Sequence, residues 1–225
     1  MLPTLSKYMA IVLCMTSIVH ADYWKFTIDK IQCIEPREWK TDHLYLRINM
    51  VTRGRDGKVK QNQTTDTLPG GSLEFPRGFT SGNGLLLQKM NLDDGDTDLL
   101  VTYTAWNKGD KELQKIGITI AELVLSVLGG NLAVAVITTA IGLVLDKFKD
   151  AYDCHGPAVL AVVPYSQADL RSMQYGQPRC ETGQYTFKTG PGCVNNQPFN
   201  LKSKLSNYTA SYCLQRYPGS TTTIA

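Results

Sequence analysis

An acidic cluster in the first half of the chain has residue types that could hold a hard metal ion. Its carboxylates come from Asp93, Asp94, Asp96 and Asp98, with Gly95 between them. Alternating carboxylates around a glycine can wrap a cation that prefers oxygen, so calcium is the cofactor that this cluster would take. The EF-hand loop is not matched, because no Glu stands at its closing position. The competing interpretation is an exposed acidic turn that leads into a strand at Leu99.

Nucleophilic catalysis would have to use one of two histidines beyond residue 21, His43 or His155. His155 follows Cys154, and adjacent side chains of an extended chain point to opposite faces, so that pair is poorly placed to cooperate. The sequence has no HExxH, no phosphate-binding loop with Lys-Ser/Thr and no GxGxxG. We therefore expect a protein that is not an enzyme. A secreted hydrolase stays open as an alternative, because the spacing of paired carboxylates exists only in three dimensions.

The cysteines predict disulfide chemistry. Five cysteines, an odd number, lie beyond residue 21. The disulfide candidates are Cys33, Cys154, Cys180, Cys193 and Cys213. Their spacings fit no tetrahedral zinc pattern, so we expect two bridges in an oxidising compartment, at least one of them within residues 154–213. The odd thiol remains free, is buried, or pairs with another chain as a disulfide-linked dimer. Cys33 is the leading candidate for it unless it reaches Cys154.

Two N-glycosylation sequons accompany the cysteines. They are Asn62-Gln63-Thr64 and Asn207-Tyr208-Thr209, which make Asn62 and Asn207 candidate glycosylation sites on an exported chain.

Residues 1–21 have the pattern of a cleavable secretory signal peptide. Lys7 precedes a largely apolar run at 8–19, and Val19-His20-Ala21 offers slender residues to the signal peptidase. The mature chain is expected to begin at Asp22 and to be secreted to the extracellular space; a membrane-anchoring N-terminal helix is the alternative. The formal net charge of +3 does not indicate a nucleic-acid partner, which needs a concentrated basic face.

Short strands must position these residues. In 22–113, Leu44, Leu46, Ile48 and Met50 alternate with polar residues, residues 24–33 begin a similar run, and residues 99–106 are rich in β-branched and aromatic types. Glycine-rich turns separate the runs. The pattern predicts a mainly β protein with an antiparallel β-sandwich, whose N-terminal part is 22–113.

The segment at 114–150 differs from both of its flanks. Glu122 is its one charge between residues 116 and 145, and residues 123–145 carry none. A break at Gly129-Gly130-Asn131 predicts an apolar helical hairpin with helices at about 116–128 and 132–149. The segment could span hydrocarbon. It is either buried against the sandwich, stored there for later membrane insertion, or an ordinary transmembrane anchor.

Residues 151–225 return to strands and turns. Short strands are expected at 159–163, 184–187 and 208–217. Four of the cysteines beyond residue 21 gather here, which predicts a disulfide-rich part that completes the same domain as 22–113.

Parts of residues 24–117 resemble a C2-type β-sandwich. Phe26-Thr27-Ile28 leading to residues 41–46 looks like the opening strands of that fold. Residues 101–107 continuing to Lys115-Ile116-Gly117 are similar to its later strand, Trp-Asp, loop and Ile-Gly stretch. The resemblance implies docking on membranes, often through calcium held by aspartates in loops. In this chain Asn107 occupies the position of the Trp-Asp aspartate, and the acidic cluster precedes the strand instead of following it.

These features together favour a secreted, non-enzymatic, toxin-like effector. Its partner would be the membrane or a surface receptor of a target cell. The alternative from another class is a soluble carbohydrate- or protein-binding sandwich in which the hairpin is only core.

Overall fold

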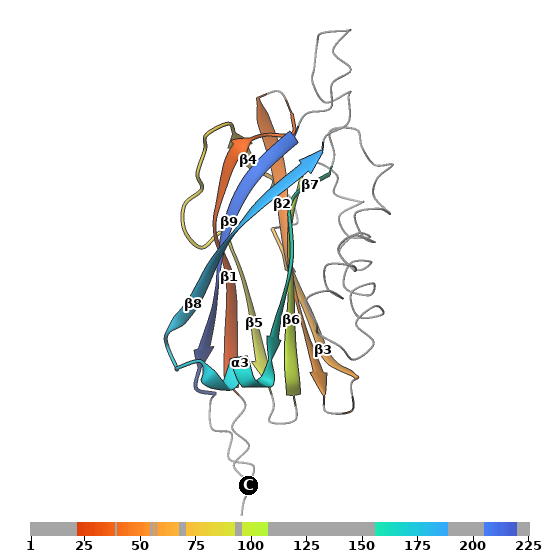
Figure 1. Ribbon diagram of the computed structural model, residues 1–225, viewed down its shortest axis with the longest axis vertical. Helices are drawn as coiled ribbons and strands as arrows, with labels where there is room; N and C mark the ends of the chain where they lie inside the picture. The colour runs from red at the N-terminus through yellow and green to blue at the C-terminus, as the bar shows by residue number, and fades with distance from the viewer. Residues whose placement is uncertain are drawn as a thin grey trace, which may run out of the picture.

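The computed structural model describes residues 22–38, 40–54, 56, 58–67, 71–92, 96–107, 156–188 and 205–219. Nine strands and one short helix make up these ranges (Figure 1). In chain order they are β1 (Asp22–Glu35), β2 (Thr41–Gly54), β3 (Val59–Asp66), β4 (Leu73–Pro76), β5 (Leu86–Leu92), β6 (Asp96–Asn107), β7 (Gly156–Ser166), α3 (Gln167–Ser172), β8 (Pro178–Lys188) and β9 (Leu205–Tyr217). The protein is thus mainly β, as its sequence predicts.

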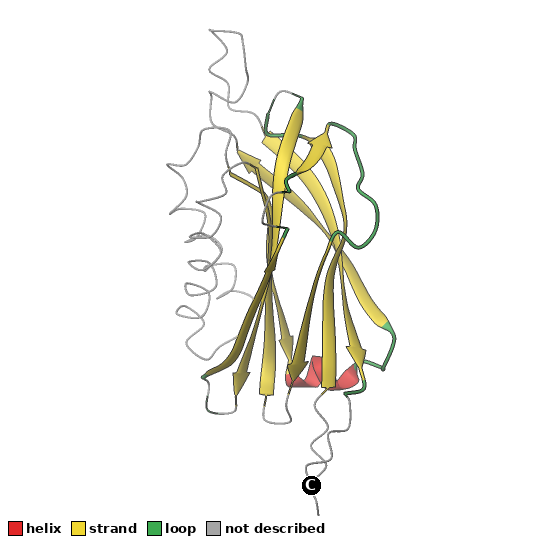
Figure 2. Ribbon diagram, turned by 180° about the vertical axis from the view of Figure 1, so that it is seen from behind, coloured by secondary structure: helices red, strands yellow, loops and turns green. Residues whose placement is uncertain are grey.

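The strands form two antiparallel sheets that face one another (Figures 1 and 2). Sheet A has the order β5-β1-β9-β8, and sheet B has the order β3-β2-β6-β7 with β4 added against β2. Sequence neighbours are often placed in different sheets: β1 and β2 are consecutive, yet β1 lies in sheet A and β2 in sheet B. The strands that follow residue 155 contribute to both sheets, β7 to sheet B and β8 and β9 to sheet A.

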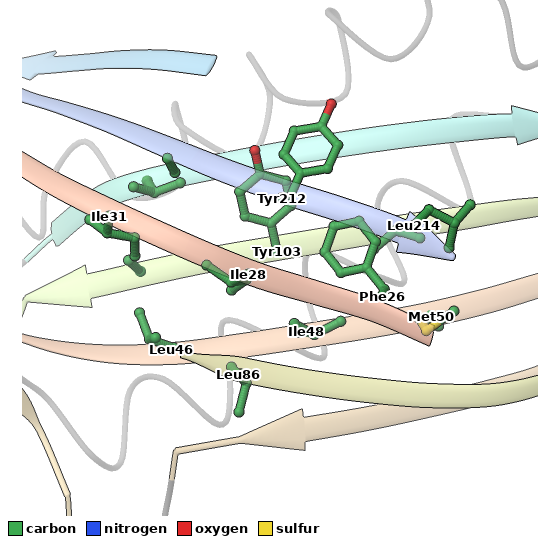
Figure 3. Close-up of a cluster of buried hydrophobic side chains, with 14 of the residues drawn as sticks. Phe26, Ile28, Ile31, Leu46, Ile48, Met50, Leu86, Tyr103, Tyr212 and Leu214 are labelled. Carbon is green, nitrogen blue, oxygen red and sulfur yellow. The ribbon is translucent and has the colours of Figure 1, made fainter. Parts of the chain in front are cut away.

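A core of alternating apolar side chains holds the sheets together. β5 shows the alternation plainly, with Leu86, Gln88, Met90 and Leu92 buried and the residues between them exposed. Phe26 and Ile28 of β1 meet Ile48 of β2 across the space between the sheets (Figure 3). Complete removal of such side chains from water is the main favourable contribution to folding, at about 1.5–3 kcal/mol for each large one.

A short helix, α3, covers one end of the core. α3 begins at a capping box, in which the Ser166 hydroxyl accepts from the Asp169 backbone N–H and the Asp169 carboxylate accepts from Ser166 N–H. Leu170 of α3 is buried in the core cluster, so the helix covers the end of the sandwich at which β7 finishes. Figure 1 shows α3 beneath the strand ends.

The central strands of sheet B are buried on both sides. Val51, Leu100 and Trp106 have exposed fractions of 2%, 5% and 1%, yet none belongs to the core cluster between the sheets. They point away from that core, because the residues alternating with them point into it. Among the described elements, none lies against this outer face of sheet B (Figure 2).

The strands expected from alternation are present. The runs at 24–33, 44–50 and 99–106 lie in β1, β2 and β6, and those at 159–163, 184–187 and 208–217 lie in β7, β8 and β9. The expected signal peptide at 1–21 and the expected apolar helical hairpin at 114–150 lie outside the described residues. No helix within the described ranges is long and apolar enough to cross a membrane.

Candidate functional site

Of the acidic cluster, the structure describes Asp96 and Asp98, and Asp98 forms an ion pair with Arg53. Its Oδ2 lies 3.0 Å from Nε of Arg53. β6 already begins at Asp96, ahead of the expected start at Leu99, and Asp96 pairs with Gly54 of β2. Asp93 and Asp94 lie outside the described residues. Within the described ranges, no group of three or more His, Cys, Asp or Glu side chains is placed to hold a metal ion.

One of the expected disulfides is present. Cys180 and Cys213 lie directly opposite on β8 and β9, and their sulfurs are bonded. This confirms a bridge within residues 154–213. Cys33 is a buried thiol in β1. Burial and the neighbouring Asp42 raise the pKa of Tyr208, with a smaller contribution from Cys33. Cys154 and Cys193 lie outside the described residues.

Both sequon asparagines lie on strands and use their side-chain oxygen. Oδ1 of Asn62 accepts from Nδ2 of Asn49 at 2.7 Å, and Oδ1 of Asn207 accepts from Nε2 of Gln184 at 3.2 Å. A glycan would attach to the amide nitrogen, so neither contact uses the atom that glycosylation requires. Both sites remain predictions.

A buried polar cluster lies where β6 ends and β7 begins, which are the two points that bound residues 108–155. Asn107 and Gly156, the last and first residues of these strands, are paired neighbours in sheet B. Arg37 and Glu38 of the short connection from β1 to β2 contact both strand ends. We call this group the root cluster and define it as Arg37, Glu38, Asp42, Asn107, Gly156, Pro157 and Tyr208.

Asp42 organises the root cluster. Its carboxylate accepts from the backbone N–H of Arg37 at 2.6 Å and of Glu38 at 2.9 Å, and from the hydroxyl of Tyr208 on β9. Burial raises the pKa of Asp42 above its ordinary value of 3.8, against the lowering effect of these three hydrogen bonds. One carboxylate therefore connects the β1–β2 turn to the opposite sheet.

Arg37 attaches β7 to the same turn. Its side chain is 1% exposed, and Nη1 donates to the carbonyl of Pro157 at 3.0 Å. Gly156 lies directly against the guanidinium group: a Cβ at that position would come within 2.5 Å of Nη2. The absence of a side chain at Gly156 is therefore required for Arg37 to lie there.

Asn107 attaches the end of β6. Its Oδ1 accepts from the backbone N–H of His43 at 2.8 Å, and its Nδ2 donates to Oε1 of Glu38 at 3.1 Å. Asn107 stands at the position where a C2-type pattern has a calcium-binding aspartate. Here its side chain instead hydrogen-bonds to His43 of β2 and to Glu38. Both ends of the undescribed stretch are thus fixed by one set of buried hydrogen bonds.

A tyrosine cluster lies between the sheets on the side of β8. Tyr103 and Tyr185 share a hydrogen bond between their hydroxyls, and Tyr212 donates to Oε2 of Glu181 at 2.8 Å. Burial raises the pKa of Tyr103 and of Tyr212, so both rings keep their protons across the physiological range. These hydroxyls act as neutral hydrogen-bonding groups in the packing of the sandwich. Elsewhere, His43 Nε2 lies 3.6 Å from Glu74 Oε1 in an exposed pair.

The sequence did not lead us to the root cluster. Arg37 and Glu38 are charged residues in a short connection and Asp42 is a charged residue at the start of β2, and for such residues composition predicts exposure. The one available signal is a charge-rich turn that contains Pro36 and directly follows an alternating strand.

Comparison with known proteins identifies no relative. No protein-family model matches the chain, and no curated protein matches it. Among solved structures, one match is the secretin InvG (residues 176 to the end) of the Salmonella SPI-1 type III secretion injectisome in its open-gate state. It is 8% identical over 89% of this chain, with a TM-score of 0.16, and this chain spans 61% of the length of that one. A likeness of this size does not indicate a shared fold.

Proposed function

We propose that this protein is a secreted, non-enzymatic effector that acts at the membrane of a target cell through its apolar segment at 116–145. The observation that carries the proposal is the attachment of both ends of residues 108–155 to one buried cluster. Asn107 and Gly156 are adjacent in sheet B, so the chain leaves and returns at a single position. A segment attached in this way can change its surroundings without unfolding the strands.

The uncharged run at 123–145 gives that segment its chemistry. It is long enough to cross hydrocarbon, and within it small residues allow close helix contact. The membrane is therefore the target surface that we propose, and a surface receptor is the other partner that the sequence leaves open.

The outer face of sheet B supports storage of the segment against the sandwich before insertion. Leu100, Trp106 and Leu160 point outward from sheet B and are at most 5% exposed. Residues 116–145 belong to the stretch that connects β6 to β7 of this sheet, so they are the cover that we propose. Storage there would keep an apolar segment out of water during secretion.

A disulfide and a glycosylation sequon support export, in addition to the expected signal peptide. The Cys180–Cys213 disulfide is compatible with an oxidising compartment. Asn62 is exposed on β3, at the edge of sheet B, where a glycosylated side chain can be accommodated.

The burial of the outer face of sheet B also favours one alternative function. If residues 116–145 never leave the outer face of sheet B, the protein is a soluble recognition module for a carbohydrate or a protein. The two functions differ in whether lipid changes the position of the segment.

Dye release from phospholipid vesicles by the mature protein separates them. The effector releases dye, whereas the Val134→Asp variant releases little, because an unpaired carboxylate does not enter hydrocarbon cheaply. Val59→Asp is the matched control, since Val59 is 45% exposed on β3 and the same chemical change there leaves release unchanged.

Ala135→Ser covers the case in which Val134→Asp does not fold. This milder change is expected to leave the unfolding midpoint nearly intact and to reduce dye release. Absence of release by the folded wild-type protein at every lipid composition tested would reject the effector and favour the recognition module.

A further inference from the structure

The outer face of sheet A carries a group of cationic, aromatic and apolar side chains at the end where β1 begins. Because alternate residues of a strand share a face, Tyr23 and Lys25 of β1 point outward while Trp24 and Phe26 enter the core. Leu87 and Lys89 of β5 and Tyr217 of β9 share that outward side. We call these five residues the lysine–tyrosine face.

Two lysines on this face oppose each other. Lys25 and Lys89 are direct cross-strand partners in the β1–β5 ladder. Like charges at such a pair repel and lower the stability of a sheet. Neither lysine forms an ion pair with a carboxylate in the described parts of the chain.

Tyrosine rings hold the lysines instead. Nζ of Lys25 lies 6.0 Å from the centre of the Tyr217 ring, and Nζ of Lys89 lies 5.5 Å from that of Tyr23. The two rings also contact each other, with centres 5.6 Å apart. The neighbouring Tyr23 raises the pKa of Lys89, so this ammonium group stays charged at every physiological pH. Cation–ring contacts orient both charges but do not neutralise them, and no carboxylate of the described residues does so.

The carboxylates of β1 have other partners. Asp22, next to Tyr23, pairs with Arg216, and Glu35, at the far end of β1, pairs with Arg77. Asp29 accepts from the backbone N–H of Gly84. A local conflict that the surrounding residues do not resolve is typical of a surface that meets a ligand of opposite charge. The missing partner is therefore an anion.

Three properties of the face favour a lipid surface over other anions. The cations are lysines, which act as point charges and give no bidentate fork to a fixed acceptor. Tyrosine is enriched at the level of lipid headgroups. Leu87 is 37% exposed beside the lysines, and an exposed apolar side chain gains by entering the headgroup region.

We infer that the lysine–tyrosine face is the docking surface for anionic phospholipid headgroups. The inference rests on the proposed action at a membrane and names the lipid class that the protein recognises.

Vesicle flotation tests the inference with the full mature protein. The wild type is expected to float with phosphatidylcholine vesicles that contain phosphatidylserine and to float much less with phosphatidylcholine alone. Lys25→Gln combined with Lys89→Gln should lower the partition coefficient about 25-fold, at about fivefold for each lysine near an anionic surface. Lys58→Gln combined with Lys60→Gln is the matched control, because it removes the same charge from exposed positions at the β2–β3 hairpin.

Several results would overturn the inference. They are an equal loss of partitioning in the two double variants, equal flotation with both vesicle types, or binding to heparin without binding to anionic vesicles. Folding is not a confounding factor, since loss of the Lys25–Lys89 repulsion should leave the thermal midpoint unchanged or raised.

Dye release keeps this inference separate from the proposed function. At saturating lipid the Lys25→Gln, Lys89→Gln protein should still release dye, and failure of the wild type to release dye would count against the function alone.

Discussion

Asp42, near the start of β2, makes contacts with both the β1–β2 turn and the opposite sheet. Two backbone N–H groups of the β1–β2 turn and the hydroxyl of Tyr208 all donate to its carboxylate. Removal of one partner from such a buried group costs about 1–3 kcal/mol, because the remaining partners lose their hydrogen bonds in a place that water does not reach. Single residues of the root cluster are therefore where the attachment of 108–155 can be tested.

Titration of Asp42 should leave a signature in the pH dependence of stability. Burial raises the pKa of Asp42, so the folded protein binds this proton more tightly than the unfolded chain. Its contribution is fully present below 3.8 and is lost as the pH rises through the raised value. Asp42→Asn cannot titrate. The difference in the free energy of unfolding between wild type and variant should therefore fall as the pH rises, as measured by urea unfolding from pH 3 to pH 7. A difference that grows with pH would show a lowered pKa instead.

Gly156→Ala should displace Arg37. The added Cβ would lie 2.5 Å from Nη2, so either the guanidinium group or the start of β7 must move. We expect a loss of about 1–3 kcal/mol, the usual cost of overpacking a filled interior. Gly82→Ala is the control, because nothing lies within 4 Å of a Cβ at that position. Equal unfolding midpoints for the two variants would show that Arg37 adjusts without cost.

Strand β8 is the element that depends most on covalent attachment. It is an edge strand of sheet A, and most of its side chains are exposed. Few buried apolar groups hold it, so the Cys180–Cys213 bond to β9 supplies stability that packing does not.

Replacement of both bridge cysteines by alanine should release β8 before the rest of the sandwich. A disulfide with a sequence separation of 33 contributes about 3–4 kcal/mol in the chain-entropy estimate. Hydrogen exchange is expected to show faster exchange for amides of β8 than for those of β1 and β6. Thr182→Ala, which loses only a hydroxyl contact with Ser211, serves as the control. Uniform acceleration across both sheets would contradict a local role for the bond.

Elements with clear alternation could be predicted from the sequence, and the others could not. β2 places Leu44, Leu46 and Ile48 on its buried side, which is the pattern that identified it. β3 has no such pattern, because it is an edge strand whose polar side chains bond to Asn49 and to other side chains of sheet B. β5 was missed since Gln88 interrupts its apolar side; this glutamine is buried and accepts from Thr65.

The candidate sites were less predictable than the strands. The root cluster joins residues as far apart as Asp42 and Tyr208, and nothing in local spacing reports such a contact. The lysine–tyrosine face likewise depends on the register between β1 and β5, which places Lys25 opposite Lys89. Charge pattern along one strand carries no information on the strand that will lie beside it.

At the scale of the whole molecule, the two sheets of the sandwich have different outer surfaces. One end holds the root cluster, from which the apolar segment departs, and α3 covers the opposite end (Figure 1). The lysine–tyrosine face is on sheet A, and the buried outer face is on sheet B. Our proposals assign attachment to lipid and storage of the apolar segment to different sheets of one sandwich.

The central claim is that residues 116–145 enter the lipid bilayer, and photo-crosslinking from lipid tests it most directly. The intact mature protein is mixed with vesicles that carry a photoactivatable group in their acyl chains, irradiated, digested with trypsin and analysed by mass spectrometry. Lys115 and Lys147 bound the segment, and no other Lys or Arg lies between them, so trypsin releases it as the single peptide 116–147. The account predicts acyl-chain adducts on that peptide and few on peptides from the strands. Adducts that are absent from 116–147, with the protein bound to the vesicles, would contradict it.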